Sequence, residues 1–176
     1  VSNTCLFFGI DWTGANNRLY VTCSVDYTIM WTWVGPTTMA TGQWYDIAVV
    51  HNGTAPVFYI DGTDVTANGS FTVTTDKTKW WKAIYADATT DAANFTIGAQ
   101  FWGNTPVATH FLNGKISDFR LWTSALSSAN ITTLYNSGNG TTSAIGSEVF
   151  WIKGTQDLSS LGGNSTTKII TNFGGN

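Results

Sequence analysis

The sequence predicts an all-β protein: an antiparallel sandwich of two β-sheets with one short peripheral helix. Short runs of β-branched and aromatic residues recur along the chain, separated by Gly, Asn and Asp. Residues 41–62 contain two turn signals, so the chain reverses twice there. Only one stretch, near residue 130, has helical periodicity. A chain of 176 residues can fill one core, so we expect a single domain over residues 1–176.

Nine short segments have the composition of strands, and this number implies two stacked sheets. Pro36, Pro56 and Pro106 fall between them, as expected for a residue that cannot donate to a strand ladder. The predicted strands are residues 6–10, 19–25, 28–34, 44–50, 57–60, 71–74, 95–99, 111–112 and 115–122.

The clearest local signal is a hairpin between the fourth and fifth predicted strands. The turn His51-Asn52-Gly53-Thr54 contains residues that adopt positive φ angles. Asp61-Gly62 then closes the second strand with a dipeptide that suits a type I′ turn.

One helix is predicted after the last of these strands. Ser127 is a good N-cap, and Ile131, Leu134 and Tyr135 share one helical face. We expect Gly138 to end the helix in a left-handed conformation.

Several motifs resemble one known family. Gly42-Gln43-Trp44, an apolar strand, Asn-Gly and then Tyr-Ile-Asp-Gly are similar to the laminin-G-like branch of the concanavalin A-like lectin/glucanase jelly rolls. Residues 95–98, 111–122, 125–126 and 134–138 resemble the closing strands and short helix of that family, in the same order. The resemblance covers residues 41–138 and implies a jelly-roll domain of the kind used in glycan binding and cell adhesion.

The tail has two interpretations. Residues 150–152, 154–164 and 168–175 resemble the strands that open many members of this family, whereas such strands are hard to find before Cys5. Residues 141–176 are therefore predicted either to complete the sheet as a permuted segment or to begin a following repeat. A chain that starts at Val1 is expected to be processed or excised from a longer protein.

Composition argues against two classes of partner. Charged residues are 11% of the chain and the net charge is −3, whereas phosphate binding needs clustered Lys and Arg. Lys77, Lys79 and Lys82 do cluster, and we interpret them as a solvated loop. No apolar run is long enough to insert into a membrane. Abundant Thr, Asn and Gly favour an extracellular or virion-surface location.

The two cysteines leave two alternatives open. If residues 5–11 and 18–25 pair around Gly14, Cys5 falls opposite Cys23 and a cross-strand disulfide can form. Otherwise both are buried free thiols. The sequence also has six Asn-X-Ser/Thr sequons, of which Asn52 and Asn68 are expected at turn tips. The six are Asn52, Asn68, Asn94, Asn130, Asn139 and Asn164.

No catalytic residues are predicted, so we expect the chain not to be an enzyme. Its acidic residues are ten Asp and Glu148, whereas glycosidases of this fold need a pair of carboxylates across the sugar. Asp61 and Asp64 are close in sequence, but the turn explains Asp61 better than catalysis does. His51 and His110 adjoin no nucleophile motif and have no zinc-site spacing.

Calcium is the one cofactor that the residues allow. Asp87 and Asp91 are the nearest candidates, and Asp76 and Asn104 can join them from neighbouring loops. The competing interpretation is a set of solvated carboxylates, because no EF-hand ligand series is present.

The nine tryptophans divide by position. Trp44 and Trp122 are predicted to lie in the core, and Trp31 and Trp33 share one face of a strand, which suits either sheet packing or a concave binding face. Trp80, Trp81 and Trp102 lie in or next to the irregular segments at residues 75–90 and 103–109. The predicted ligand-binding set is Trp80, Trp81, Trp102, Asn104 and Asp87, with loop packing as the alternative.

These observations predict a non-catalytic surface-recognition module on a secreted or virion-borne protein. Its ligand is a glycan by resemblance, bound through aromatic stacking and loop hydrogen bonds. The alternative is a structural or decoration module of a virion, fibre or extracellular filament, which binds neighbouring protein subunits in an assembly.

Overall fold

The computed structural model describes residues 5–10, 17–80, 96–102, 105–112, 114–141 and 143–152. The chain groups into two compact units. The first unit comprises residues 1–93 and 125–142, and the second comprises residues 94–124 and 143–176.

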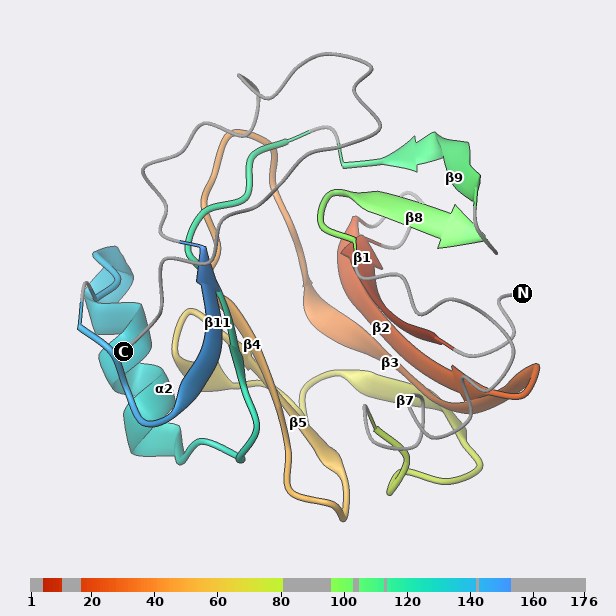
Figure 1. The fold of residues 1–176 in the computed structure, drawn as a ribbon, viewed down its shortest axis with the longest axis horizontal. Coiled ribbons are helices and arrows are strands. Elements are labelled where there is room, and N and C mark those ends of the chain that lie inside the picture. The colour runs from red at the N-terminus through yellow and green to blue at the C-terminus, as the bar shows by residue number, and fades with distance from the viewer. Residues whose placement is uncertain are drawn as a thin grey trace. The chain divides into compact units, whose positions relative to one another are not determined.

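The first unit contains two antiparallel sheets, which confirms the predicted all-β class (Figure 1). The four-stranded sheet has the order β1-β2-β3-β7, and the three-stranded sheet has the order β4-β5-β6. The strands are β1 (Cys5–Ile10), β2 (Arg18–Val25), β3 (Thr28–Thr38), β4 (Ile47–His51), β5 (Pro56–Ile60), β6 (Thr63–Asp64) and β7 (Ser70–Thr74).

Aromatic side chains join these two sheets. The ring of Trp33 on β3 stacks on Phe58 of β5 with centroids 4.0 Å apart, and Trp31 meets the same ring edge-on at 6.1 Å. Both indoles are fully buried, so Trp31 and Trp33 form a packed sheet face and not a concave binding face. Burial of one such indole stabilises the fold by about 4–6 kcal/mol before side-chain entropy is subtracted.

The predicted hairpin is confirmed, with one correction. β4 and β5 pair from Ile47↔Ile60 to His51↔Pro56, and Asp61 and Gly62 both have positive φ angles, as a type I′ turn requires. Pairing begins at Ile47, and Trp44 therefore lies in the preceding loop with 64% of its surface exposed. The prediction that Trp44 is a core residue is wrong, because its segment does not join the ladder.

The three prolines all lie within strands, so their predicted placement in connections is wrong. Pro36 lies at an irregularity in the β2–β3 pairing, between the pairs Tyr20↔Val34 and Arg18↔Thr38. At such a position the strand does not need a regular hydrogen bond from its backbone nitrogen, which proline cannot donate. Pro56 is the first residue of β5, another position that a proline tolerates.

In the described part of the second unit there are two strand pairs. β8 (Ala99–Trp102) pairs with β9 (Thr105–Phe111), and β10 (Phe119–Trp122) pairs with β11 (Glu148–Ile152), both antiparallel. The predicted strand boundaries at 95–99, 111–112 and 115–122 are wrong, and residues 105–109 are a strand where we expected an irregular loop. β10 starts at Phe119 because Asp118 has a φ of 55°, which is incompatible with an extended strand.

The tail contributes β11 to the second unit. Its register on β10 runs from Phe119↔Ile152 to Trp122↔Glu148 with one irregularity. The permuted origin of residues 141–176 stays a prediction.

The predicted helix is present as α2 (Ser128–Tyr135), with Ser127 as its N-cap and Asn130 completing a capping box. Ile131 is buried, as its face predicted. The left-handed residue that ends α2 is Asn136, not Gly138, which ends the following 3₁₀ turn η1 (Asn136–Gly138). Tyr135 packs on the turn after β5, where a Cβ added to Gly62 would lie 2.8 Å from its ring.

The cysteines lie in a register that differs by one residue from the predicted one. Cys5 pairs with Ser24 and Leu6 pairs with Cys23, which puts the two thiols on opposite faces of the sheet. Both thiols are free, so the structure has no disulfide. Burial, followed by the nearby Cys5 and Asp76, raises the pKa of Cys23 to about 12.

Candidate ligand-binding site

The structure describes only part of the predicted ligand-binding set. Of this set, Trp81, Asp87 and Asn104 lie outside the described residues, and so does the calcium candidate Asp91. Trp102 belongs to β8, and its side chain also lies outside the described part.

Trp80 packs against the core of the first unit. Its ring is stacked with Trp31 at 5.8 Å and with His51 at 5.1 Å, and Phe8 meets it edge-on at 6.4 Å. The side chain is half-buried. These contacts favour loop packing over ligand stacking for Trp80.

The segment before Trp80 is held by backbone and side-chain contacts. His51 Nε2 bonds to the carbonyl oxygen of Lys77 at 2.8 Å, and Trp31 Nε1 donates to that of Lys79 at 2.8 Å. The Lys77 ammonium lies 4.0 Å from the centroid of the Phe71 ring. These two lysines thus contact groups of the fold as well as solvent.

Asp76, a calcium candidate, already has partners. Hydrogen bonds from the hydroxyl and backbone of Thr78 lower the pKa of its carboxyl group, and Lys79 lies 3.8 Å away. Within the described ranges, no three His, Cys, Asp or Glu side chains are grouped so that they could hold a metal ion. A calcium site stays a prediction.

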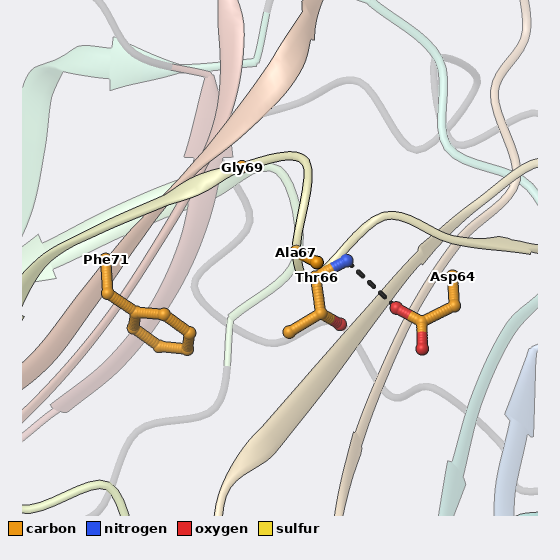
Figure 2. Close-up of a pocket in the computed structure, with 5 residues that line it drawn as sticks. All are labelled: Asp64, Thr66, Ala67, Gly69 and Phe71. Carbon is orange, nitrogen blue, oxygen red and sulfur yellow. Dashed lines mark hydrogen bonds between the residues drawn. The ribbon is translucent and has the colours of Figure 1, made fainter.

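The site that the structure adds is a hollow beside the connection between β6 and β7 (Figure 2). Its volume is about 540 Å³, and it is lined by Asp64, Thr66, Ala67, Gly69 and Phe71. In Figure 2 the Phe71 ring lies on one side of Thr66 and Ala67, and Asp64 lies on the other. An aromatic ring and a carboxylate therefore border the same space.

Hydrogen bonds of the backbone hold the wall of this hollow. The amides of Asn68 and Gly69 both donate to the carbonyl oxygen of Val65 at 3.1 Å. The amide of Val65 in turn donates to the carbonyl oxygen of Phe58 at 2.9 Å. Trp33 Nε1 donates to the carbonyl of Thr66 at 3.2 Å. These bonds determine the course of the backbone around the hollow.

Gly69 has to be a glycine because its backbone lies against the Trp33 ring. A Cβ added to Gly69 would lie 2.4 Å from the Trp33 indole, closer than any relaxed contact. The backbone can therefore lie directly on the buried ring only without a side chain at this position.

Asp64 is the polar group that the hollow offers to a ligand. It is exposed, and its Oδ1 accepts the amide of Thr66 at 2.9 Å, which holds the carboxylate in place. The hydroxyl of Thr66 already accepts the amide of Phe58 at 2.8 Å. Asp61, by contrast, accepts the amide of Asp46 at 2.9 Å, as its turn role predicts.

Sequence reasoning did not place a site here. It considered Asp64 only as a partner of Asp61 and directed the search to later loops. The signal that was available is Asp64-Val65-Thr66 followed by Asn68-Gly69 and Phe71, a turn that presents one carboxylate and one aromatic residue.

A family model described as the concanavalin A-like lectin/glucanases superfamily, of the laminin G type, matches residues 2–132. The chain belongs to this superfamily. The match extends from the segment before β1 into α2, so it includes the hollow and excludes β11.

One solved structure is similar to the chain at low identity. It is an S-layer domain-containing protein (residues 221–444) from Clostridium thermocellum, with 20% sequence identity and a TM-score of 0.39. The alignment covers 77% of this chain and 64% of that chain, so this chain spans less than two thirds of its length. No curated protein matches the sequence. Among the described residues, no helix is long and apolar enough to cross a membrane.

The second unit contains an ion-pair cluster around a buried arginine, partly outside the residues of the family match. Arg120 on β10 donates through Nε and Nη2 to Asp118 at 3.1 and 2.9 Å, and through Nη1 to Glu148 at 2.9 Å. Its guanidinium group lies 3.7 Å from the ring centroid of Trp151, whose indole donates to Asp118. We name these four residues, Asp118, Arg120, Glu148 and Trp151, the Arg120 cluster.

The Arg120 cluster joins β10 to β11. Each carboxylate bonds to the same guanidinium group, and Arg120 also donates to the carbonyl of Ser143 at 3.2 Å. Nearby, the predicted core residue Trp122 is half-buried and donates to the carbonyl of Ile145 at 2.7 Å. Sequence reasoning missed the cluster, although Asp118 and Arg120 fall on one face of the predicted strand 115–122.

Proposed function

We propose that this chain is a non-catalytic recognition module of an extracellular protein that binds carbohydrate in the hollow between Asp64 and Phe71. Membership of the lectin/glucanase superfamily supports recognition as the general role. The observation that carries the specific proposal is one aromatic ring and one exposed carboxylate that line the same hollow of about 540 Å³. This volume is within the usual range for small-ligand sites.

The chemistry of a sugar suits both walls. A pyranose ring has an apolar face of C–H groups that stacks on an aromatic ring, and Phe71 supplies such a ring. Sugar hydroxyls donate well to a carboxylate, and hydrogen bonds to a charged group contribute about 1.5–3 kcal/mol each. Asp64 is held in place by Thr66, so little entropy is lost when it binds.

The same residues support binding without hydrolysis. Cleavage of a glycosidic bond uses two carboxyl groups on opposite sides of the sugar. Among the described residues that line the hollow, Asp64 is the acidic one, and Asp118 and Glu148 are bound to Arg120.

A glycan array followed by calorimetry tests this function. Asp64→Asn keeps the acceptor for Thr66 and removes the charge, so affinity should fall at least about tenfold, as expected for loss of about 1.5 kcal/mol. Asp76→Asn is the matched control, because Asp76 makes the same bond to the amide two residues ahead but lies outside the hollow lining. An array without any bound glycan, or equal affinity of wild type and Asp64→Asn, refutes the proposal.

One observation favours a structural role as a second candidate. Trp44 and Tyr27 are each 64% exposed, and such side chains suit burial against neighbouring subunits of a virion, fibre or filament. Sedimentation of wild type and Trp44→Ser tests this role. A concentration-dependent assembly that Trp44→Ser dissolves supports it, and a wild type that stays monomeric argues against it.

A further inference from the structure

We propose that the turn His51-Asn52-Gly53 promotes its own deamidation, which makes Asn52 a site of spontaneous modification. In this reaction the backbone nitrogen after an asparagine attacks the side-chain amide carbon. Asn-Gly sequences are prone to it because glycine leaves that nitrogen unhindered. At Asn52 the fold also supplies a base and donors to the developing oxyanion.

The base is His51. The amide of Gly53 donates to His51 Nδ1 at 2.9 Å, while His51 Nε2 lies 2.8 Å from the carbonyl oxygen of Lys77. A carbonyl oxygen can only accept, so Nε2 carries the hydrogen and Nδ1 presents its lone pair to the Gly53 N–H group. Stacking on Trp80 holds the ring in this orientation. A general base thus contacts the proton that must leave.

The electrophile is polarised by the same turn. Asn52 Oδ1 accepts the amide of Thr54 at 2.9 Å and that of Ala55 at 3.4 Å. Negative charge develops on this oxygen when the amide carbon becomes tetrahedral, and two backbone N–H groups are placed to stabilise it. Asn52 and Gly53 are exposed, so water can enter and ammonia can leave.

The steps balance without any reagent except water. The Gly53 nitrogen gives its proton to His51 Nδ1 and bonds to Cγ of Asn52. The tetrahedral intermediate then expels Nδ2, which takes the proton from the imidazolium and leaves as ammonia. Water opens the resulting succinimide at either carbonyl, so the product is Asp or isoaspartate.

Two other Asn-Gly pairs in the first unit are internal controls. The amide of Gly69 after Asn68 donates to the carbonyl of Val65, and the amide of Gly140 after Asn139 donates to that of Tyr135, both at 3.1 Å. A backbone carbonyl is a far weaker base than imidazole, so neither nitrogen is activated. All three sites have the sequence Asn-Gly, and they differ in the group that accepts the hydrogen bond from the glycine amide.

The modification would change this hairpin in two ways. Each event adds one negative charge to a chain whose net charge is −3. It also destroys the sequon Asn52-Gly53-Thr54, so glycosylation and deamidation of Asn52 exclude each other.

Peptide mapping by mass spectrometry of the folded protein, aged at neutral pH, tests the proposal. We expect Asp and isoaspartate to accumulate at Asn52 roughly 100-fold faster than at Asn68 or Asn139, the lower end of general-base effects. His51→Phe keeps a ring to stack on Trp80 but removes the base, and it should lower the rate at Asn52 to that of the other two sites. In urea, all three sites should react at similar rates.

Two results would overturn the proposal. The first is a rate at Asn52 in the folded wild type that does not exceed those at Asn68 and Asn139. The second is a folded His51→Phe variant that deamidates as fast as wild type. If His51→Phe does not fold, the ratio of folded to urea-unfolded rates in wild type decides alone, and a ratio at Asn52 no higher than at the control sites refutes the role of the fold.

Discussion

Replacement of Glu148 by Gln tests whether the tail strand is integral to the fold. The Arg120 side chain is 3% exposed and that of Glu148 is 7% exposed, so the pair is buried. Arginine does not lose its proton in proteins, and removal of one partner from a buried pair leaves charge uncompensated at a cost of about 3–5 kcal/mol. Asp118 remains bound to the guanidinium group and is 37% exposed. We therefore expect Glu148→Gln to lower the free energy of unfolding by an amount at the lower end of this range, about 3 kcal/mol.

Thermal and urea unfolding, followed by tryptophan fluorescence, measure this loss. For a chain of this size, about 3 kcal/mol corresponds to a decrease in Tm of roughly 6–12 °C. Asp118→Asn should cost less, because that carboxylate is partly solvated. Replacing the pair with apolar residues, Arg120→Met with Glu148→Leu, should recover most of the stability lost by Glu148→Gln. A Glu148→Gln variant within about 0.5 kcal/mol of wild type would refute the reasoning, since that is the range of ordinary surface substitutions.

Four further predictions concern the tail, the thiols and the hollow. Deletion of residues 147–176 should unfold the second unit, because β10 loses its partner strand, and near-normal melting would reject the permuted tail. Iodoacetamide at neutral pH should label Cys5 and spare Cys23 in the folded protein, with both labelled in urea. Because the pKa of Cys23 is raised from 9.0 to about 12, the unfolded chain releases this proton first, and stability should fall as the pH rises above 9; a rise would contradict the burial argument. Gly69→Ala should destabilise by about 1–3 kcal/mol through its clash with Trp33, and an unchanged melt would show that the backbone can move aside.

The predicted calcium site can be tested by unfolding measurements as well. Thermal melts with calcium and with chelator should separate if Asp87 and Asp91 bind the ion, and coincident curves would count against a site.

The parts of the fold that sequence reasoning predicted correctly depend on contacts between near neighbours. Asp61 and Gly62 adopt positive φ angles because of their own chemistry, and Ser127 caps α2 through Asn130, three residues away. The alternation of Trp31 and Trp33 also follows from the period of a strand. Such features hold whatever the rest of the chain does.

The errors concern properties that depend on a distant partner. Trp44 has the pattern of a strand residue, but ladder pairing begins only at Ile47. A shift of one residue in pairing reverses the face of every side chain on a strand, and this separates Cys5 from Cys23.

The sequence alone determined the all-β class, the β4–β5 hairpin, the helix and the family, because periodicity and turn chemistry are local and recur along the chain. Only the tertiary structure decided where the hollow and the Arg120 cluster lie. Asp64 and Phe71 border one hollow because Trp33, far along the chain, holds the turn between them. Arg120 is neutralised by Glu148 from a strand beyond the family match. Contacts across such separations depend on how strands pair and pack, and no local pattern encodes that choice.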